Sequence, residues 1–133
     1  MAYTTSATTK GGREGRAILE NAGLSLAMAF PKELGGSGEG HNPEQLFALG
    51  YSSCFGQALL VLGKKHGVDA QAAKVTCEVT LSTDGGFTLS AELKVSIPGA
   101  EKDKVQALVD DAHTVCPYSK ATKGSMPVKL SVV

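Results

Sequence analysis

The pattern of apolar and polar residues is dominated by one stretch, residues 42–66, that runs without a turn signal. Asn42 suits a helix N-cap, Pro43 suits the first helical position and Gly67 suits a C-terminal stop. The stretch therefore predicts one helix of about seven turns. Because no continuous polar face runs along it before Lys64, we expect this helix to be buried on most sides.

Alternation of apolar and polar residues predicts strands in the second half of the chain. Residues 74–82 and 87–97 alternate on either side of a short turn, so they predict an antiparallel hairpin. Residues 126–132 predict a last strand. Between these strands, residues 101–115 carry apolar side chains at helical spacing. They predict an amphipathic helix that ends near Cys116, because a proline follows it.

The first third of the chain predicts short strands and a loop. Residues 3–9 predict a strand, and residues 17–20 and 24–30 predict a hairpin. Residues 34–43 hold four glycines but lack the spacing of a nucleotide-binding loop. The whole order of elements predicts a single α+β domain over residues 1–133, with a mostly antiparallel sheet and a long buried central helix.

Composition and charge narrow the possible partners. The 133 residues carry 13 basic and 13 acidic side chains without clusters, so we expect neither nucleic-acid binding nor attachment to a membrane. The N-terminus lacks the apolar core of a signal peptide, and the most apolar run, residues 58–63, is too short to span a bilayer. We therefore expect a cytoplasmic protein, in which three cysteines without a C-x-x-C pair are redox or buried thiols.

The candidate catalytic or metal-binding residues are cysteines and histidines. Cys54 lies within the long apolar helix, where burial alone is as compatible with a structural role as with a reactive one. Cys77 lies on the apolar face of a predicted strand, so we expect it to be inert. His113 precedes Cys116 by three residues, a spacing that suits half of a metal site or a Cys-His nucleophile pair. The other half is missing from the sequence, so we predict no metal and no bound cofactor.

Three sequence blocks point to a family. Residues 42–55 read N-P-E-Q-L-F-A-x-G-Y-S-x-C-F, residues 115–122 read V-C-P-Y-S-x-A-T, and residues 11–15 read G-G-R-x-G. Together and in this order, the blocks resemble the organic hydroperoxide resistance proteins, the Ohr branch of the Ohr/OsmC peroxidase family. Three blocks in register are far more specific than any one of them.

This resemblance implies a fold, an activity and a set of roles. The fold is OsmC-like, and the activity is a peroxidase that reduces organic hydroperoxides to alcohols. By position, Cys54 is the peroxidatic cysteine, Cys116 resolves its sulfenic acid as a disulfide, and Arg13 with Glu44 controls Cys54. An external dithiol then resets the enzyme, and the reductant usual in the family is a lipoyl group on a protein.

The physics of peroxide cleavage agrees with these roles. A thiolate attacks one oxygen while the other leaves as an alkoxide, so the cysteine must ionise and a cation must stand near the leaving group. Burial raises the pKa of a thiol, whereas a guanidinium about 4 Å from the sulfur stabilises the thiolate by about 4 kcal/mol at an effective dielectric of about 20. We therefore expect Arg13 to outweigh the burial of Cys54, with Glu44 orienting the guanidinium.

Helix geometry predicts a homodimer. Glu44 and Cys54 are ten residues apart, so an unbroken helix separates them by about 15 Å along its axis. Either the helix breaks near Gly50, or Arg13 and Glu44 of one subunit reach Cys54 of the other. The nearly all-round apolar helix favours the second arrangement, an intertwined homodimer in which a second copy supplies cover.

The residues around Cys54 predict an apolar substrate pocket. We expect its walls to come from the long helix and from the segment that follows Cys116. The predicted wall residues are Leu46, Phe47, Tyr51, Phe55, Tyr118 and Met126. An alkyl tail gains about 0.8 kcal/mol for each methylene buried there, so alkyl and fatty-acid hydroperoxides should react faster than hydrogen peroxide.

Two other functions compete with this interpretation. One is a peroxidase of the OsmC branch that reduces hydroperoxides generally. The other is a non-enzymatic dimeric module that binds apolar ligands and in which the cysteines have no role. Loss of two thiols after one equivalent of an alkyl hydroperoxide favours a peroxidase, whereas no loss favours the module.

Overall fold

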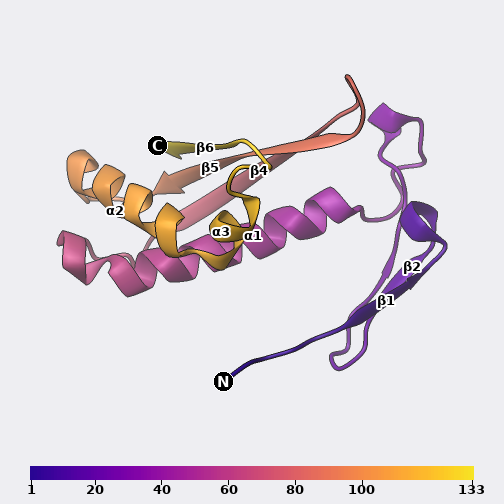
Figure 1. Cartoon of the computed structure of the whole chain (residues 1–133), viewed down its shortest axis with the longest axis horizontal. Coiled ribbons are helices and arrows are strands. Elements are labelled where there is room, and N and C mark those ends of the chain that lie inside the picture. Colours follow the sequence, from indigo (N-terminus) through magenta and orange to yellow (C-terminus); the bar gives the residue numbers. More distant parts are fainter. The chain divides into compact units, whose positions relative to one another are not determined.

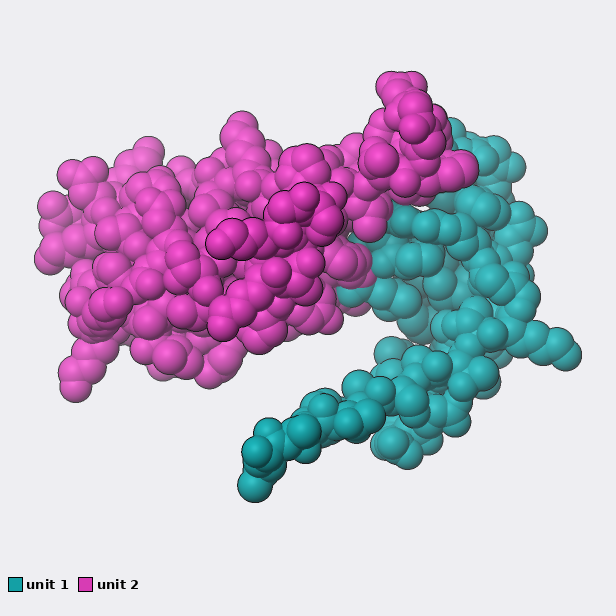
Figure 2. Space-filling view, viewed as in Figure 1, with its two compact units in different colours: residues 1–46 teal, residues 47–133 magenta.

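The computed structural model describes residues 1–133 and divides into two compact units, Met1–Leu46 and Phe47–Val133 (Figure 2). The helix α1 (Pro43–Leu62) begins in the first unit and ends in the second. The division therefore does not by itself make two independent domains. A single domain over the whole chain stays a prediction.

The first unit is a small antiparallel sheet with very little core of its own. Its strands are β1 (Ala7–Lys10), β2 (Arg16–Leu19) and β3 (Ser25–Ala27), in the order β1-β2-β3. The pairing of β2 with β3 is antiparallel, which confirms the predicted hairpin. Met28 is the only buried hydrophobic residue in this unit. Because an apolar sheet face must be covered by another element, this sheet needs cover that it does not provide itself.

The second unit contains the other sheet and most of the helices. Its elements, after α1, are β4 (Lys74–Ser82), β5 (Thr88–Ser96), α2 (Lys102–Val115), α3 (Pro117–Thr122) and β6 (Val128–Val132). Figure 1 shows α1 and α2 running along this sheet. The predicted hairpin, amphipathic helix and last strand are all confirmed within two residues of their predicted bounds.

The core of the second unit lies between one face of this sheet and the two long helices. The strand β5 alternates, with Leu93 and Val95 fully buried and with Glu92 and Lys94 on the opposite face. The helices add their own buried side chains to the same cluster. The fully buried helix residues in it are Tyr51, Phe55, Leu59, Val105, Leu108, Val109 and Ala112, and Cys116, directly after α2, belongs to the same cluster.

The sheet arrangement differs from the prediction in two respects. The chain forms two three-stranded sheets rather than one, and β6 pairs with β5 in parallel, with Leu93 opposite Leu130. The other strand pairings are antiparallel. The connection from β5 to β6 passes through α2 and α3, and a crossover of that length allows a parallel pair where a tight turn would not.

The start of α1 agrees with the sequence prediction, and its end comes earlier. The backbone N–H of Gln45 donates to the Asn42 side chain at 2.9 Å, and the Asn42 N–H donates to the Gln45 side chain at 3.1 Å. This reciprocal capping confirms Asn42 as the N-cap. The α-helix ends at Leu62, and a 3-10 turn, Lys64–His66, leads to Gly67 in the left-handed conformation. The helix is therefore shorter than predicted.

Only one side of α1 is covered in a single chain. Tyr51, Phe55 and Leu59 have no exposed surface, but Leu49 is 65% exposed and Val61 is 67% exposed. The expectation of burial on most sides therefore holds for one side only. The physical reason is that a three-stranded sheet and α2 pack against one side of α1 and leave an apolar opposite side in solvent.

By length and composition alone, α1 is also apolar enough to cross a membrane. The run of residues 58–63 that the sequence analysis found too short is only part of this 20-residue helix. The central helix of a folded domain passes the same test. Because α1 places Tyr51, Phe55 and Leu59 in the core of the second unit, we describe it as a core helix.

Candidate active site

The two predicted reactive thiols lie together in the second unit. Cys54 is near the middle of α1, and Cys116 occupies the junction at which α2 ends and α3 begins. Their sulfur atoms are 3.3 Å apart, and the Cys116 thiol donates a hydrogen bond to the Cys54 sulfur. Cys116 is buried and Cys54 partly buried, and both are free thiols. A disulfide places its sulfurs about 2.05 Å apart, so only a small movement separates this pair from a covalent bond.

The sequence at the junction explains why Cys116 stays in place. Pro117 cannot continue α2, so that helix ends beside the cysteine. The backbone N–H of Cys116 still donates to the Ala112 carbonyl at 2.9 Å, which completes the last turn of α2. Pro117 then occupies the first position of α3. The Cys116 side chain is thus fixed from both sides.

Burial governs the protonation of Cys54. It raises the pKa of the Cys54 thiol, because a buried thiolate loses its hydration. The backbone N–H of Tyr118 opposes this rise by donating a hydrogen bond to the sulfur, whereas the neighbouring Cys116 adds to it. No cation is among the groups that shift this pKa. These neighbours together favour the thiol over the thiolate.

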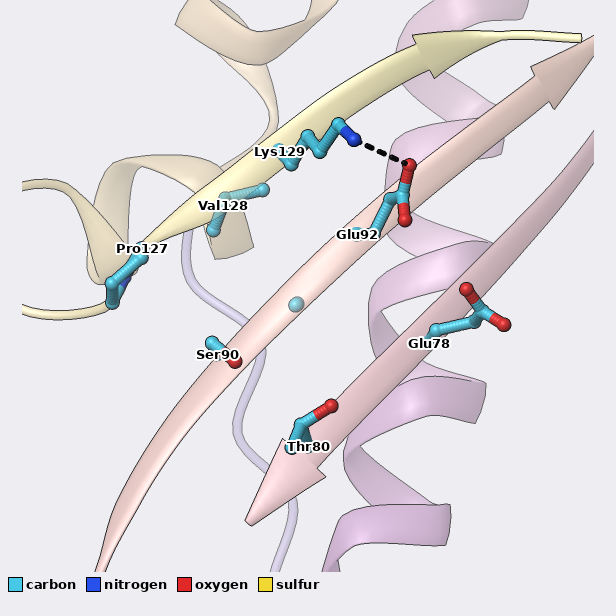
Figure 3. Close-up of a pocket in the computed structure, with 8 residues that line it drawn as sticks. Glu78, Thr80, Ser90, Glu92, Pro127, Val128 and Lys129 are labelled. Carbon is cyan, nitrogen blue, oxygen red and sulfur yellow. Dashed lines mark ion pairs between the residues drawn. The ribbon is translucent and has the colours of Figure 1, made fainter. Parts of the chain in front are cut away.

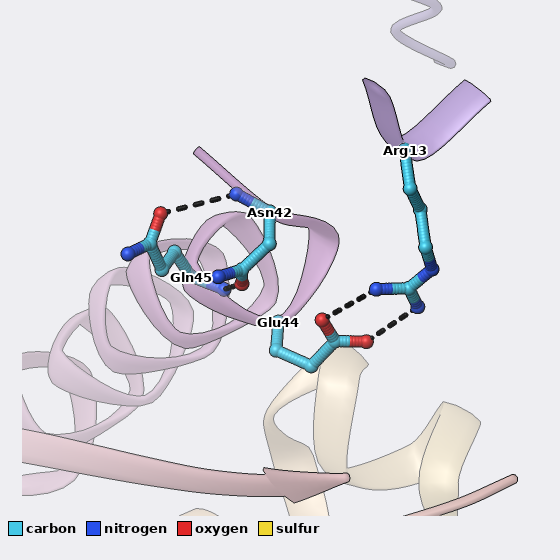
Figure 4. A network of polar contacts seen from close by, with 4 residues as sticks. All are labelled: Arg13, Asn42, Glu44 and Gln45. Atoms are coloured by element: carbon cyan, nitrogen blue, oxygen red, sulfur yellow. Dashed lines mark hydrogen bonds and ion pairs between the residues drawn. The ribbon is translucent and has the colours of Figure 1, made fainter. Parts of the chain in front are cut away.

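Arg13 and Glu44 form an ion pair in the first unit (Figure 4). The two terminal nitrogens of Arg13 donate to the two carboxylate oxygens of Glu44, at 2.8 and 2.6 Å. The hydrogen bonds from Arg13 hold the pKa of Glu44 below its ordinary value, although partial burial opposes this. The structure thus brings together the two charged residues that the sequence predicts as a pair.

Glycines shape the turn that carries Arg13. Gly11 and Gly12 have φ angles of 85° and 57°, a left-handed conformation that side-chain-bearing residues rarely adopt. They lead into the 3-10 turn Gly12–Glu14. Arg13 also lies over the ring of Phe30, with 5.9 Å between the guanidinium carbon and the ring centroid. Backbone, carboxylate and ring together fix the direction of the guanidinium.

The helix that carries both Glu44 and Cys54 is continuous. α1 runs without interruption from Pro43 to Leu62, so a break near Gly50 is excluded. Ten residues of α-helix separate Glu44 from Cys54 by about 15 Å along the axis. Of the two arrangements that the sequence left open, the one within a broken helix is therefore wrong.

Three of the predicted pocket residues form an aromatic cluster in the second unit. The ring centroids of Phe47 and Tyr51 are 5.9 Å apart, those of Phe47 and Tyr118 are 5.9 Å apart, and those of Tyr51 and Tyr118 are 5.7 Å apart. Tyr51 is fully buried, whereas Tyr118 is 39% exposed. Tyr118 is therefore the member of this cluster that reaches solvent, two residues after Cys116.

The remaining pocket residues have different surroundings. Phe55 is fully buried in the core, so it does not line an open pocket in this state, and Met126 packs against the same core while partly buried. Leu46 belongs to the first unit, where it lines an apolar hollow of about 220 Å³ together with side chains of β1, β2 and β3. The structure thus supports the aromatic part of the predicted pocket most directly.

A buried hydrogen-bond network beside Cys116 was not predicted. The Ser119 hydroxyl lies 2.7 Å from the Tyr51 hydroxyl and 2.7 Å from Nδ1 of His113. Ser119 is 2% exposed, so both contacts replace hydrogen bonds to water. Ser119 stands in the block V-C-P-Y-S-x-A-T, but sequence alone offers no sign that its partners are Tyr51 and His113. The network fastens the start of α3 to α1 and to the end of α2.

The histidines have ordinary polar partners. Nδ1 of His41 is 3.2 Å from the Gln45 side chain, and Nε2 of His66 is 2.8 Å from Asp111. The chain brings together no group of three or more His, Cys, Asp or Glu side chains that could hold a metal ion. The His-x-x-Cys spacing of His113 is thus accounted for by the hydrogen bond to Ser119.

A hollow of about 530 Å³ lies on the outer face of the second sheet (Figure 3). Glu78, Glu92 and Lys129 are among its lining residues, and the Lys129 ammonium is 3.8 Å from the Glu92 carboxylate. No cysteine or histidine lines it. The hollow therefore lacks both a thiol and an imidazole, and the thiol pair is the better candidate for an active site.

Comparisons with known proteins agree in pointing to one family. A family model described as "OsmC-like protein" matches residues 36–131. The organic hydroperoxide resistance protein of Xanthomonas axonopodis pv. citri is 44% identical to this chain, and the alignment covers 98% of this chain and 94% of the relative. The crystal structure of an organic hydroperoxide resistance protein from Legionella pneumophila matches with a TM-score of 0.90 at 42% identity, covering 99% of this chain and 98% of that one. The OhrB structure from Bacillus subtilis matches with a TM-score of 0.87 at 37% identity, covering 98% of both chains.

Ser119→Ala should destabilise the fold, because it leaves the buried Tyr51 hydroxyl without this partner. We expect a loss of about 1–3 kcal/mol in the free energy of unfolding, measured by urea denaturation at fixed protein concentration. Tyr51→Phe is the matched variant, because it removes the other half of the contact. The double variant should cost clearly less than the sum of the two single variants. Additive losses would show that the two hydroxyls do not depend on each other.

Proposed function

This chain belongs to the organic hydroperoxide resistance branch of the OsmC-like family, and from that premise we propose that it is a thiol peroxidase that reduces organic hydroperoxides to alcohols. The observation that carries the proposal is the 3.3 Å approach of the Cys54 and Cys116 sulfurs. Two free thiols at this distance can complete a redox cycle without a metal or an organic cofactor. We place this activity in the cytoplasm, where thiols are kept reduced between turnovers.

The proposed cycle begins at Cys54. Its thiolate attacks one peroxide oxygen, the O–O bond breaks, and the other oxygen leaves as an alkoxide that takes up a proton and becomes the alcohol. Cys54 is then a sulfenic acid. The Cys116 sulfur attacks the Cys54 sulfur, the hydroxyl leaves as water, and a disulfide forms. The close approach of the two sulfurs supports this step over further oxidation of Cys54.

The disulfide must be reduced by two electrons from outside the protein. A dithiol can supply them through a mixed disulfide and closes to its own disulfide. We propose a lipoyl group carried by a protein, following the family resemblance. Such a reductant would first meet Cys54, because Cys116 is fully buried and Cys54 is the partly exposed member of the pair.

Arg13 is the cation that we propose for Cys54. Burial raises the pKa of the thiol, and the groups around it in the second unit do not offset this rise. Arg13 is directed by Glu44 and Phe30, and a guanidinium has five N–H donors, of which the ion pair uses two. The remaining donors can stabilise both the thiolate and the departing alkoxide.

The active unit that we propose is a homodimer. The apolar side of α1 is uncovered, with Leu49 65% exposed, Leu60 41% exposed and Val61 67% exposed. The sheet of the first unit likewise offers an open apolar hollow and has one buried hydrophobic residue. A second copy would cover both surfaces by the same contacts in each direction. It would also let Arg13 and Glu44 act across the subunits, an arrangement that the unbroken α1 favours.

The thiols provide the first test. One equivalent of an alkyl hydroperoxide should reduce the free-thiol count from three to one, because Cys54 and Cys116 pair and Cys77 remains. Cys54→Ser should abolish peroxide reduction. Cys116→Ser should allow one turnover to a Cys54 sulfenic acid, which a second equivalent of hydroperoxide then oxidises to sulfinic acid. Cys77→Ala is the control and should retain activity. Full activity in Cys54→Ser, or an unchanged thiol count in the wild type, would favour the non-enzymatic module.

Arg13→Ala should slow the oxidation of Cys54 by about a hundredfold or more, because the thiolate and the alkoxide both lose their cation. Stopped-flow measurements across pH should also show the rate profile moving to higher pH, since less thiolate is present at neutral pH. Arg16→Ala is the control, because Arg16 is an exposed neighbour that donates to Ser25 at 3.0 Å. A hundredfold loss in Arg16→Ala with none in Arg13→Ala would transfer the cationic role to Arg16.

Leu60→Glu should convert the dimer to a monomer, because it places a charge in the apolar side of α1. Sedimentation velocity at assay concentration measures the change, and peroxidase activity should fall with the dimer fraction. Phe87→Glu is the matched control, because Phe87 is 77% exposed in the turn between β4 and β5. A wild-type protein that is monomeric and fully active at these concentrations would refute the dimer.

A further inference from the structure

We propose that Gly50 is a positioning residue, which gives the Tyr118 ring room to lie on α1 and so sets where the segment Cys116–Tyr118 stands against Cys54. The inference rests on the proposed function, because it assigns Gly50 a part in the chemistry of Cys54. Gly50 itself has no side chain that could touch a substrate. Its effect would pass through Tyr118.

The space above Gly50 is filled by Tyr118. A β-carbon added to Gly50 would lie 2.7 Å from the Tyr118 hydroxyl oxygen and 3.1 Å from the ring atoms Cε2 and Cζ. The ring cannot easily give way, because Phe47 and Tyr51 pack beside it with centroids 5.9 and 5.7 Å away. Tyr118 therefore rests directly on the backbone of α1, and any larger residue at position 50 would displace it.

The conformation of Gly50 does not explain its presence. Gly50 is not among the glycines with positive φ, and α1 continues through it as an unbroken helix. A glycine in the interior of a helix destabilises that helix relative to alanine. The backbone thus gains nothing from glycine here. The remaining explanation for glycine at position 50 is the close approach of the Tyr118 ring, which leaves no room for a β-carbon.

A short segment of chain connects Tyr118 to both sulfurs. The backbone N–H of Tyr118 lowers the pKa of the Cys54 thiol, and Cys116 is two residues earlier. Gly50 lies one helical turn before Cys54, so both residues are on neighbouring parts of the same helix face. Displacing the ring would move the N–H donor away from Cys54. It would also disturb the 3.3 Å approach of the Cys116 sulfur.

The same contact determines what a substrate meets beside Cys54. Tyr118 is 39% exposed, and its ring lies over Gly50 with Phe47 alongside. The exposed part of Tyr118 adds aromatic surface to the segment that follows Cys116. If the ring moves, an alkyl tail loses that surface, whereas hydrogen peroxide loses nothing. Gly50 is therefore expected to influence substrate preference as well as the reactivity of the thiol.

The test compares two glycine-to-alanine substitutions in the same helix. Gly50→Ala places a methyl group against Tyr118, whereas Gly56→Ala meets only one atom within 4.0 Å, a methyl group of Val75. Both substitutions improve helix propensity by a similar amount. We expect Gly50→Ala to slow the oxidation of Cys54 by an alkyl hydroperoxide about tenfold. Gly56→Ala should leave this rate unchanged. Equal rates for wild type and Gly50→Ala, or equal losses in both variants, would overturn the proposal.

Tyr118→Phe should rescue the slow oxidation of Cys54 that we expect in Gly50→Ala. It removes the hydroxyl oxygen that makes the shortest contact with the added methyl group. We therefore expect Gly50→Ala to have at most a twofold effect when it is introduced into Tyr118→Phe, against about tenfold in the wild type. A full tenfold loss in both backgrounds would show that the effect does not pass through Tyr118, and the proposal would fail.

Alkylation of Cys54 separates this inference from the proposed function. Iodoacetamide reacts with the thiolate and needs no peroxide, and mass spectrometry assigns the modified cysteine. Gly50→Ala should shift the midpoint of Cys54 alkylation to higher pH, because the thiolate loses the Tyr118 N–H donor that lowers its pKa. If the wild type does not reduce hydroperoxides, this shift still supports the positioning role. An unchanged alkylation profile in Gly50→Ala would overturn it.

Discussion

The proposed chemistry depends on one contact, the 3.3 Å approach of the Cys54 and Cys116 sulfurs. The two residues are 62 positions apart in the chain, so this contact is a product of tertiary packing. Cys54 is held because α1 places Tyr51 and Phe55 in the core, and Cys116 is held because Pro117 ends α2 beside it. Sliding α1 by one residue would turn the Cys54 sulfur by about 100° around the helix axis. The redox pair therefore needs the register of the helices as much as the cysteines themselves.

The second constraint is electrostatic. The core that holds the sulfurs together also raises the pKa of Cys54, so the packing that makes the disulfide possible opposes the ionisation that starts the cycle. Arg13 offsets this only if its guanidinium stands nearer to the sulfur than the Glu44 carboxylate does, because the ion pair as a whole carries no net charge.

The sequence predicts the elements well because their signals are local. Strict alternation identified β4 and β5, and Asn42 with Pro43 identified the start of α1. The parallel pairing of β6 was missed, because alternation reveals which face is apolar but not the direction of the neighbouring strand. The short α3 was missed since six residues carry too little periodicity.

The candidate site is likewise predictable from the sequence only in part. Sequence blocks indicated Cys54, Cys116, Arg13 and Glu44, and the structure brings each predicted pair together. The contacts of Ser119 with Tyr51 and His113 could not be predicted, since they join three separate elements. The contact of Gly50 with Tyr118 could not be predicted either, because glycine has no side chain from which a packing partner could be inferred.

A single chain lacks two features that the proposed mechanism needs, and a homodimer would supply both. The thiol pair lacks a cation among its neighbours in the second unit, and the apolar side of α1 lacks cover. In the proposed homodimer, a symmetric interface would make the same contacts in both directions, so two active sites would form together. Each site would then join thiols from one chain to a charge pair from the other. Dissociation would expose apolar surface and remove the cation in the same step, so stability and reactivity would rest on the same interface.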